Sequence, residues 1–204
     1  MSERPILFSG PMVRAILEGR KTQTRRVVAD RLLWRVMPPE HESFQLDLRI
    51  LCPYGATGDR LWVKESIRHL GTYVNGALEL DESVYVADGE QTAADAWPWK
   101  LKTLPAMFCP KGLSRLTLEV KAVRVERLQE ISENDCEAEG IERLTGNGPN
   151  FASYLVPGLG HFNFPTMVGA YRELWDGINA KRGHSWETNP WVWVVEFERA
   201  EEAR

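Results

Sequence analysis

The longest alternating run of the chain constrains its fold most. From Leu116 to Val125, apolar residues recur at nearly every second position, the period of a β-strand with two distinct faces. Weaker patterns of the same kind predict four further strands, at 6–8, 59–65, 82–87 and 191–197. The chain is therefore expected to build its core on a sheet.

The expected helices are few and short. Gly10-Pro11 opens the first, and Gly19 ends it in the manner of a C-terminal glycine. Ser132 and Asp135 resemble a capping box for a second helix that ends at Glu139, before Gly140. A third follows the cap candidate Thr166, and its apolar stripe is expected to be core: Met167, Ala170, Tyr171, Leu174 and Ile178.

Many strands with a few short helices indicate the α+β class, as a small mixed sheet or closed barrel whose ends the helices cover. The 204 residues, 43% of them hydrophobic, suffice for one domain, 1–204. Two stretches rich in proline, glycine or both, around 38–58 and 145–165, are expected to be loop insertions. The stretch at 145–165 also carries aromatic residues. It is either a flexible loop that folds over a ligand or a surface loop with its own small aromatic cluster.

Positive charge is concentrated near the N-terminus. Residues 1–36 hold eight Lys or Arg against three Asp or Glu, whereas the whole chain has a net charge of −4. Four of these cations lie between Arg20 and Arg26, interleaved with Thr22 and Thr24, directly after the first helix. Such a local cluster favours an anionic or nucleobase ligand.

Other classes of site have little support in the sequence. Three cysteines and four histidines are scattered without ligand spacing, which favours isolated side chains over a metal centre or disulfides. No apolar run approaches the roughly 18 residues of a membrane span, and the start lacks the apolar stretch of a signal peptide. We therefore expect a cytoplasmic protein without metal, cofactor or membrane partner. The sequence does not set its oligomeric state.

Three segments together resemble the ASCH domain family, which is related to the PUA-like RNA-binding barrels. Residues 19–26 match the family's Gly-x-Lys-Thr-x-Thr-x-Arg signature. The long strand of 116–125, followed by a small helix that ends in a glutamate, is the second, and the closing Val195-Glu196-Phe197 is the third. The resemblance implies a PUA-like small mixed β-barrel with short covering helices. In length the chain looks more like the larger ASCH proteins of phages and prophages.

Some bacterial ASCH proteins remove the acetyl group from N(4)-acetylcytidine with a lysine, a threonine and a glutamate. The resemblance carries these roles to Lys21, Thr24 and Glu139. Amide hydrolysis needs a nucleophile, a base and positive charge at the developing oxyanion. Either Lys21 is a neutral base, or it stays charged while Glu139 is the base, and the sequence leaves both open. Strict strand alternation separates Lys21 from Thr24, so their pairing requires a bend.

Further candidates for contact with substrate or nucleic acid are Arg20, Thr22, Arg25, Arg26, Trp62 and Glu65. Trp62 would stack on a base and Glu65 would accept from an amino group. A core tryptophan and a solvated edge glutamate are the alternative interpretations of these two.

Three functions remain as hypotheses. The first is an amidohydrolase that binds RNA or a modified nucleoside and deacylates an N-acyl cytidine derivative. The second is a module that binds RNA or nucleotide without chemistry. The third, which some ASCH relatives suggest, is a metal-dependent ribonuclease.

Overall fold

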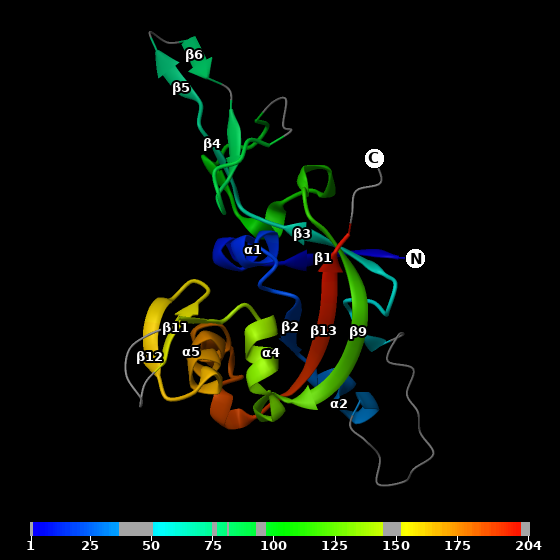
Figure 1. The fold of residues 1–204 in the computed structure, drawn as a ribbon. Coiled ribbons are helices and arrows are strands. Elements are labelled where there is room, and N and C mark those ends of the chain that lie inside the picture. The colour runs from blue at the N-terminus through cyan, green and yellow to red at the C-terminus, as the bar shows by residue number, and fades with distance from the viewer. Residues whose placement is uncertain are drawn as a thin grey trace.

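A computed structural model describes residues 2–36, 51–74, 77–80, 82–92, 97–144 and 152–200 (Figure 1). Its helices are α1 (Gly10–Leu17), α2 (Asp30–Val36), α4 (Glu133–Ala138) and α5 (Met167–Asn179). Its strands are β1 (Glu3–Leu7), β2 (Gln23–Val27), β3 (Arg60–Lys64), β4 (Ile67–His69), β5 (Thr72–Val74), β6 (Ala77–Leu80), β7 (Ser83–Tyr85), β8 (Thr103–Leu104), β9 (Thr117–Arg127), β10 (Glu142–Leu144), β11 (Ala152–Val156), β12 (Gly160–Phe164) and β13 (Trp191–Arg199).

The main sheet has five strands in the order β1-β3-β9-β13-β2. β1 and β3 are parallel, and the other neighbours are antiparallel. The alternating run at 116–125 is confirmed as the central strand β9. The expected closed barrel is wrong for the described strands, because β1 and β2 remain the two edges of an open sheet. Alternation predicts strands, but closure depends on their tilt and stagger, which alternation does not encode.

Both faces of this sheet are buried along β13. Along β13, Trp193 and Val195 belong to the core that α1 covers, whereas Val192 and Val194 belong to the core that α5 covers. All four side chains are fully buried. A strand covered on both faces explains why the C-terminal segment is a nearly continuous apolar run.

The helix caps are those that the sequence predicts. Ser132 Oγ accepts from Asp135 N at 3.1 Å, and Thr166 Oγ1 accepts from Gly169 N at 3.0 Å. Helix α4 ends at its C-cap Glu139, and Gly140 follows with φ = 95°. This stop sets the position of the Glu139 carboxylate.

The segment around 145–165 is not a loop where the structure describes it. Strands β11 and β12 form an antiparallel hairpin that pairs with β10, and Tyr154 and Val156 are buried against α5. Gly158 and Gly160 have positive φ and lie at the hairpin turn. The glycines that suggested an irregular loop therefore allow a tight turn between two strands. Residues 145–151 of this segment, and 38–50 of the other expected insertion, lie outside the described residues.

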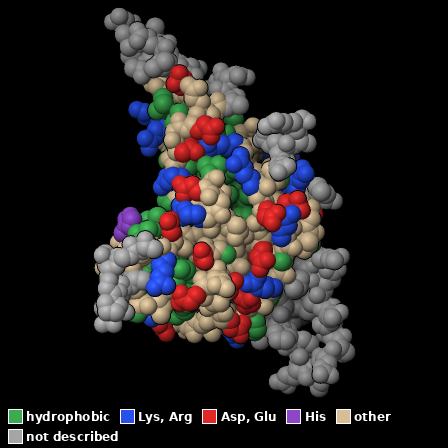
Figure 2. Space-filling model, viewed as in Figure 1, with side chains coloured by type: hydrophobic (Ala, Val, Ile, Leu, Met, Phe, Trp, Pro, Cys, Tyr) green, Lys and Arg blue, Asp and Glu red, His purple; other side chains and the backbone are tan. Residues whose placement is uncertain are grey.

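The strands between residues 67 and 104 form a projection from the main sheet, with the β5–β6 ribbon at its far end (Figure 1). A small separate core of Ile67, Tyr85, Leu104 and Cys109 holds its base together. On the face drawn in Figure 2, acidic and basic side chains are interspersed rather than separated. None of the helices in the described ranges is long and apolar enough to cross a membrane.

Replacing Gly140 by alanine is expected to lower the free energy of unfolding by about 1–3 kcal/mol. Its φ of 95° disfavours any side chain, and a Cβ would lie 3.2 Å from Lys21 Cβ and 3.3 Å from Ala15 Cβ. Gly19 is the matched control: its φ is 75°, but nothing lies within 4 Å of an added Cβ. Denaturant titration should show the larger loss for Gly140→Ala, and equal losses would contradict this packing.

Candidate active site

The basic segment lies on the turn between α1 and β2. Gly19 has φ = 75°, and the amides of Arg20 and Lys21 both donate to Ala15 O, at 2.9 and 3.0 Å. The chain is therefore still turning at Lys21, and β2 begins only at Gln23. This turn is the bend that pairing Lys21 with Thr24 requires.

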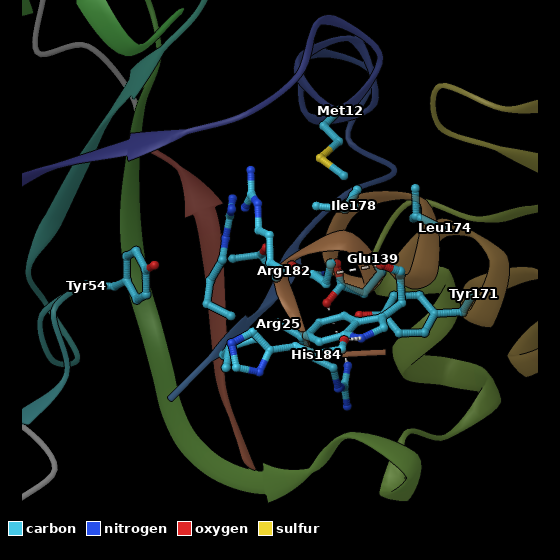
Figure 3. A pocket seen from close by; sticks show the side chains of 14 residues that line it. Met12, Arg25, Tyr54, Glu139, Tyr171, Leu174, Ile178, Arg182 and His184 are labelled. Atoms are coloured by element: carbon cyan, nitrogen blue, oxygen red, sulfur yellow. Dashed lines mark hydrogen bonds and ion pairs between the residues drawn. The ribbon is translucent and has the colours of Figure 1, made fainter. Parts of the chain in front are cut away.

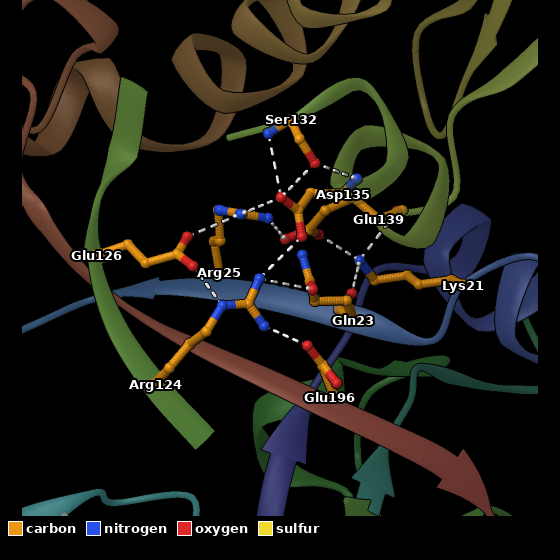
Figure 4. Close-up of polar contacts among 9 residues, drawn as sticks. All are labelled: Lys21, Gln23, Arg25, Arg124, Glu126, Ser132, Asp135, Glu139 and Glu196. Carbon is orange, nitrogen blue, oxygen red and sulfur yellow. Dashed lines mark hydrogen bonds and ion pairs between the residues drawn. The ribbon is translucent and has the colours of Figure 1, made fainter. Parts of the chain in front are cut away.

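Lys21 is fully buried and forms an ion pair with Glu139 (Figure 4). The Nζ to Oε2 distance is 2.6 Å, and the two side chains are 0% and 4% exposed. Nζ also donates to Gln23 O at 2.7 Å and to Glu139 O at 3.0 Å. Three acceptors match the three protons of an ammonium group. Burial lowers the pKa of Lys21, while the charge and hydrogen bond of Glu139 oppose that shift.

The end of α4 brings Glu139 to this lysine. Thr22 N donates to Ala138 O at 2.8 Å, and Lys21 and Glu139 form an isolated antiparallel bridge. The helix terminus thus lies directly beside the residues that lead into β2. A carboxylate at a helix C-terminus is unfavourable by itself, and the Lys21 ammonium compensates it.

Arg25, in β2, has no exposed side-chain surface and is held from one side (Figure 4). Its Nη2 lies 3.1 Å from Glu126 Oε2 and 3.3 Å from Asp135 Oδ2. Burial raises the pKa of Asp135, but hydrogen bonds from Ser132 and the charge of Arg25 outweigh it and keep that pKa well below its usual range. Two carboxylates therefore fix the Arg25 guanidinium.

A pocket of about 250 Å³ lies along β2, an edge strand of the sheet (Figure 3). Tyr54 approaches it from one side and Tyr171 from the other, with Glu139 between them. It is lined by Met12, Thr24, Arg25, Arg26, Val27, Tyr54, Glu139, Tyr171, Leu174, Trp175, Ile178, Asn179, Arg182 and His184.

Two residues that line this pocket carry buried polar atoms without partners. In the described part of the chain, Glu139 Oε1 accepts no hydrogen bond, and Arg25 Nε and Nη1 donate none, although all three atoms are buried. Oε1 lies 3.8 Å from Nη1, beyond hydrogen-bonding distance. Buried polar groups are normally paired, so an acceptor and donors left free beside one small cavity indicate a place for a ligand.

Of the three predicted catalytic residues, two line the pocket and one does not. Thr24 and Glu139 line the pocket, whereas Lys21 lies behind Glu139 and is not part of the lining. Arg25 and Arg26, predicted to contact a ligand, also line it. The catalytic roles themselves stay predictions.

The other predicted contacts lie elsewhere. Arg20 pairs with Glu18 at the surface, and Thr22 is exposed outside the pocket. Trp62 is half-buried in β3, and Lys64 Nζ lies 5.6 Å from its ring centre. Glu65 is buried in an ion pair with Arg115, whose Nε and Nη2 donate to Glu65 Oε1 and Oε2, each at 2.9 Å. Trp62 and Glu65 do not line this pocket.

Sequence reasoning missed Tyr54, Trp175, Arg182 and His184 as lining residues. Tyr171 and Leu174 belong to the stripe predicted as core, and they are buried, yet they also form a pocket wall. Helical periodicity identifies a buried face but does not show whether a cavity adjoins it. Within the ranges that the structure describes, no group of three or more His, Cys, Asp or Glu is placed to hold a metal ion.

No protein-family model matches the chain, and no curated protein matches it. Among solved structures, the chain is similar to an ASCH domain from Lactobacillus crispatus JV V101, determined as a high-resolution crystal structure. The two are 10% identical, the alignment covers 97% of this chain and 79% of that one, and the TM-score is 0.41. Similarity at this level does not transfer a function.

Proposed function

We propose that the pocket binds the base of a modified cytidine and that the protein hydrolyses an N(4)-acyl group from it. The observation that carries this proposal is that Glu139 Oε1 and Arg25 Nη1, 3.8 Å apart on two residues that line one pocket, make no hydrogen bond in the described part of the chain. An acylated cytosine offers the complementary groups, an N–H donor on N4 and acceptors on the ring and the acyl carbonyl.

Size and lining also fit a single base. Pockets for drug-sized ligands measure about 300–1,000 Å³. At about 250 Å³ this one suits a smaller, flat ligand. Tyr54, Tyr171 and Trp175 supply aromatic walls of the type on which bases stack.

The reaction itself is suggested by the sequence resemblance and by the division of labour in the site. Lys21 has its three protons engaged and does not line the pocket, so it serves to hold Glu139 charged and in place. Glu139 is then the base, through its free oxygen. Arg25 supplies the positive charge that the tetrahedral oxyanion requires.

In the proposed sequence, the Thr24 hydroxyl oxygen adds to the acyl carbonyl carbon and Glu139 takes its proton. The oxyanion accepts from Arg25. The bond from carbon to N4 breaks as Glu139 returns the proton to N4, which leaves cytidine and an acyl ester on Thr24. Water then hydrolyses this ester with Glu139 again as base, which releases the carboxylic acid and restores Thr24.

The test is incubation of the purified protein with N(4)-acetylcytidine and chromatographic detection of cytidine. Wild type should release cytidine, whereas Thr24→Val, which keeps the side-chain shape and removes the nucleophile, should lose at least about 100-fold of the rate. Thr117→Val is the matched control, a strand threonine outside the pocket. An inert wild type, or an active Thr24→Val, would contradict the reaction.

The second candidate is binding of the same base without hydrolysis. The contacts of Lys21 support it in one respect: with all three protons engaged, Lys21 is not available as the neutral base that one form of the reaction requires. This alternative predicts that wild type and Thr24→Val bind N(4)-acetylcytidine with similar affinity and that neither releases cytidine.

A further inference from the structure

The pocket carries more positive charge than a neutral nucleoside requires. Three guanidinium groups, those of Arg25, Arg26 and Arg182, line it with one carboxylate, Glu139. Lys21 balances Glu139, and Glu126 and Asp135 together hold Arg25. This leaves the positive charges of Arg26 and Arg182 without a balancing carboxylate in the pocket lining, although the chain as a whole has a net negative charge.

Neither of these arginines has a carboxylate among its contacts in the described part of the chain. Arg26 Nη2 donates to Leu7 O at 2.7 Å, and its guanidinium lies 5.1 Å from the Phe8 ring centre. The Nε atom of Arg26 is buried and has no hydrogen-bond partner among the described residues. A buried donor without a partner is costly, and a charged acceptor would satisfy it.

Arg182 lies at the outer part of the same pocket. It closes a single 3₁₀ turn, Ala180–Arg182, that continues α5, and its side chain is exposed. Gly183 follows with φ = 85° and redirects the chain, so that the half-buried His184 also lines the pocket (Figure 3). Glu139 is 3% exposed, which places a buried acceptor and an accessible cation in one cavity.

We infer that the ligand carries a phosphate group, which Arg26 and Arg182 bind while its base reaches Glu139. The substrate class is then a nucleotide, free or within an RNA chain, rather than a free nucleoside. Guanidinium groups bind phosphate with strong, charge-assisted hydrogen bonds. The inference rests on the proposed function for the position of the base, but it concerns binding and does not require hydrolysis.

The experiment is calorimetric titration of wild type with cytidine, cytidine 5′-phosphate, cytidine 3′-phosphate and inorganic phosphate. At least one nucleotide should bind about 10-fold more tightly than cytidine, since a hydrogen bond to a charged group typically contributes a factor of this order. The preference should shrink in high salt. The position of the phosphate on the preferred nucleotide shows which backbone direction an RNA would take.

Two variants complete the test. Arg182→Ala should remove most of the preference for the nucleotide over cytidine, because the phosphate contact is lost. Lys181→Ala is the matched control, since this cation is exposed one position earlier and does not line the pocket. It should keep the preference.

The outcomes separate this inference from the hydrolase. Nucleotide preference that depends on Arg182, without release of cytidine from N(4)-acetylcytidine, supports the phosphate site and contradicts the reaction. Release of cytidine with equal affinity for cytidine and its phosphates overturns the phosphate site alone. Inorganic phosphate that binds as tightly as the nucleotides, an equal loss in Lys181→Ala, or no binding of any ligand also overturns it.

Discussion

Replacing Lys21 by methionine is expected to lower the free energy of unfolding by about 3–5 kcal/mol, the cost of leaving one partner of a buried ion pair uncompensated. Methionine occupies a similar volume, so the loss reports the charge rather than a cavity. Among the described residues, Arg25 would then be the one cation left in an ion pair with Glu139, at 3.8 Å and without a hydrogen bond. Urea titration with a shared slope for both proteins measures the difference.

The double variant Lys21→Met/Glu139→Gln shows whether the charge is the cause. Once the carboxylate is neutral, stability should recover by at least about 1 kcal/mol relative to Lys21→Met, a coupling typical of residues in contact. If Lys21→Met alone is as stable as wild type, or if the double variant is less stable still, the pair does not hold this site together.

Replacing Glu139 by glutamine is expected to reduce the hydrolysis of N(4)-acetylcytidine by about 10²–10⁴-fold, the usual contribution of a general base. Glutamine keeps the shape and still offers an oxygen to Lys21, so the affinity for the substrate should change much less than the rate. Single-turnover release of cytidine, compared with calorimetric binding, separates the two effects.

The control for this variant is Glu142→Gln. Glu142 lies three residues further along, 44% exposed, 3.6 Å from Arg20 and outside the pocket. It should retain the wild-type rate. A Glu139→Gln protein that remains active would remove Glu139 from the role of base, and equal losses in both variants would point to a general effect of surface charge.

The elements that follow local rules could be predicted from the sequence. Strand β9 follows from alternation, α1 from Gly10-Pro11 and Gly19, and α4 from Ser132 and Gly140. The β11–β12 hairpin was not predicted, because its glycines resemble those of an irregular loop. The sheet is open because β1 and β2 lie at its two edges and do not pair with each other. No local sequence pattern determines whether two edge strands pair.

The candidate site also has features that the sequence could predict and features that it could not. The meeting of Lys21 with Glu139 followed from a family resemblance and from the unfavourable position of an acid at a helix C-terminus. That all three protons of Lys21 would be engaged could not be foreseen, because two of the three acceptors are backbone carbonyls, Gln23 O and Glu139 O, which side-chain types in the sequence do not indicate. Tyr54 and His184 join the pocket through tertiary packing, for which their sequence neighbourhoods give no sign.

The separation along the chain between Lys21 and Glu139 has a consequence for biosynthesis. The lysine leaves the ribosome 118 residues before its carboxylate, and β2 must wait still longer for its partner β13. Contacts at such separations pay a large loop-closure entropy and slow the search for the native state. The nascent chain therefore holds an unmatched cation until Glu139 has been made and an unpaired β2 until β13 has followed, so the pocket forms only after both.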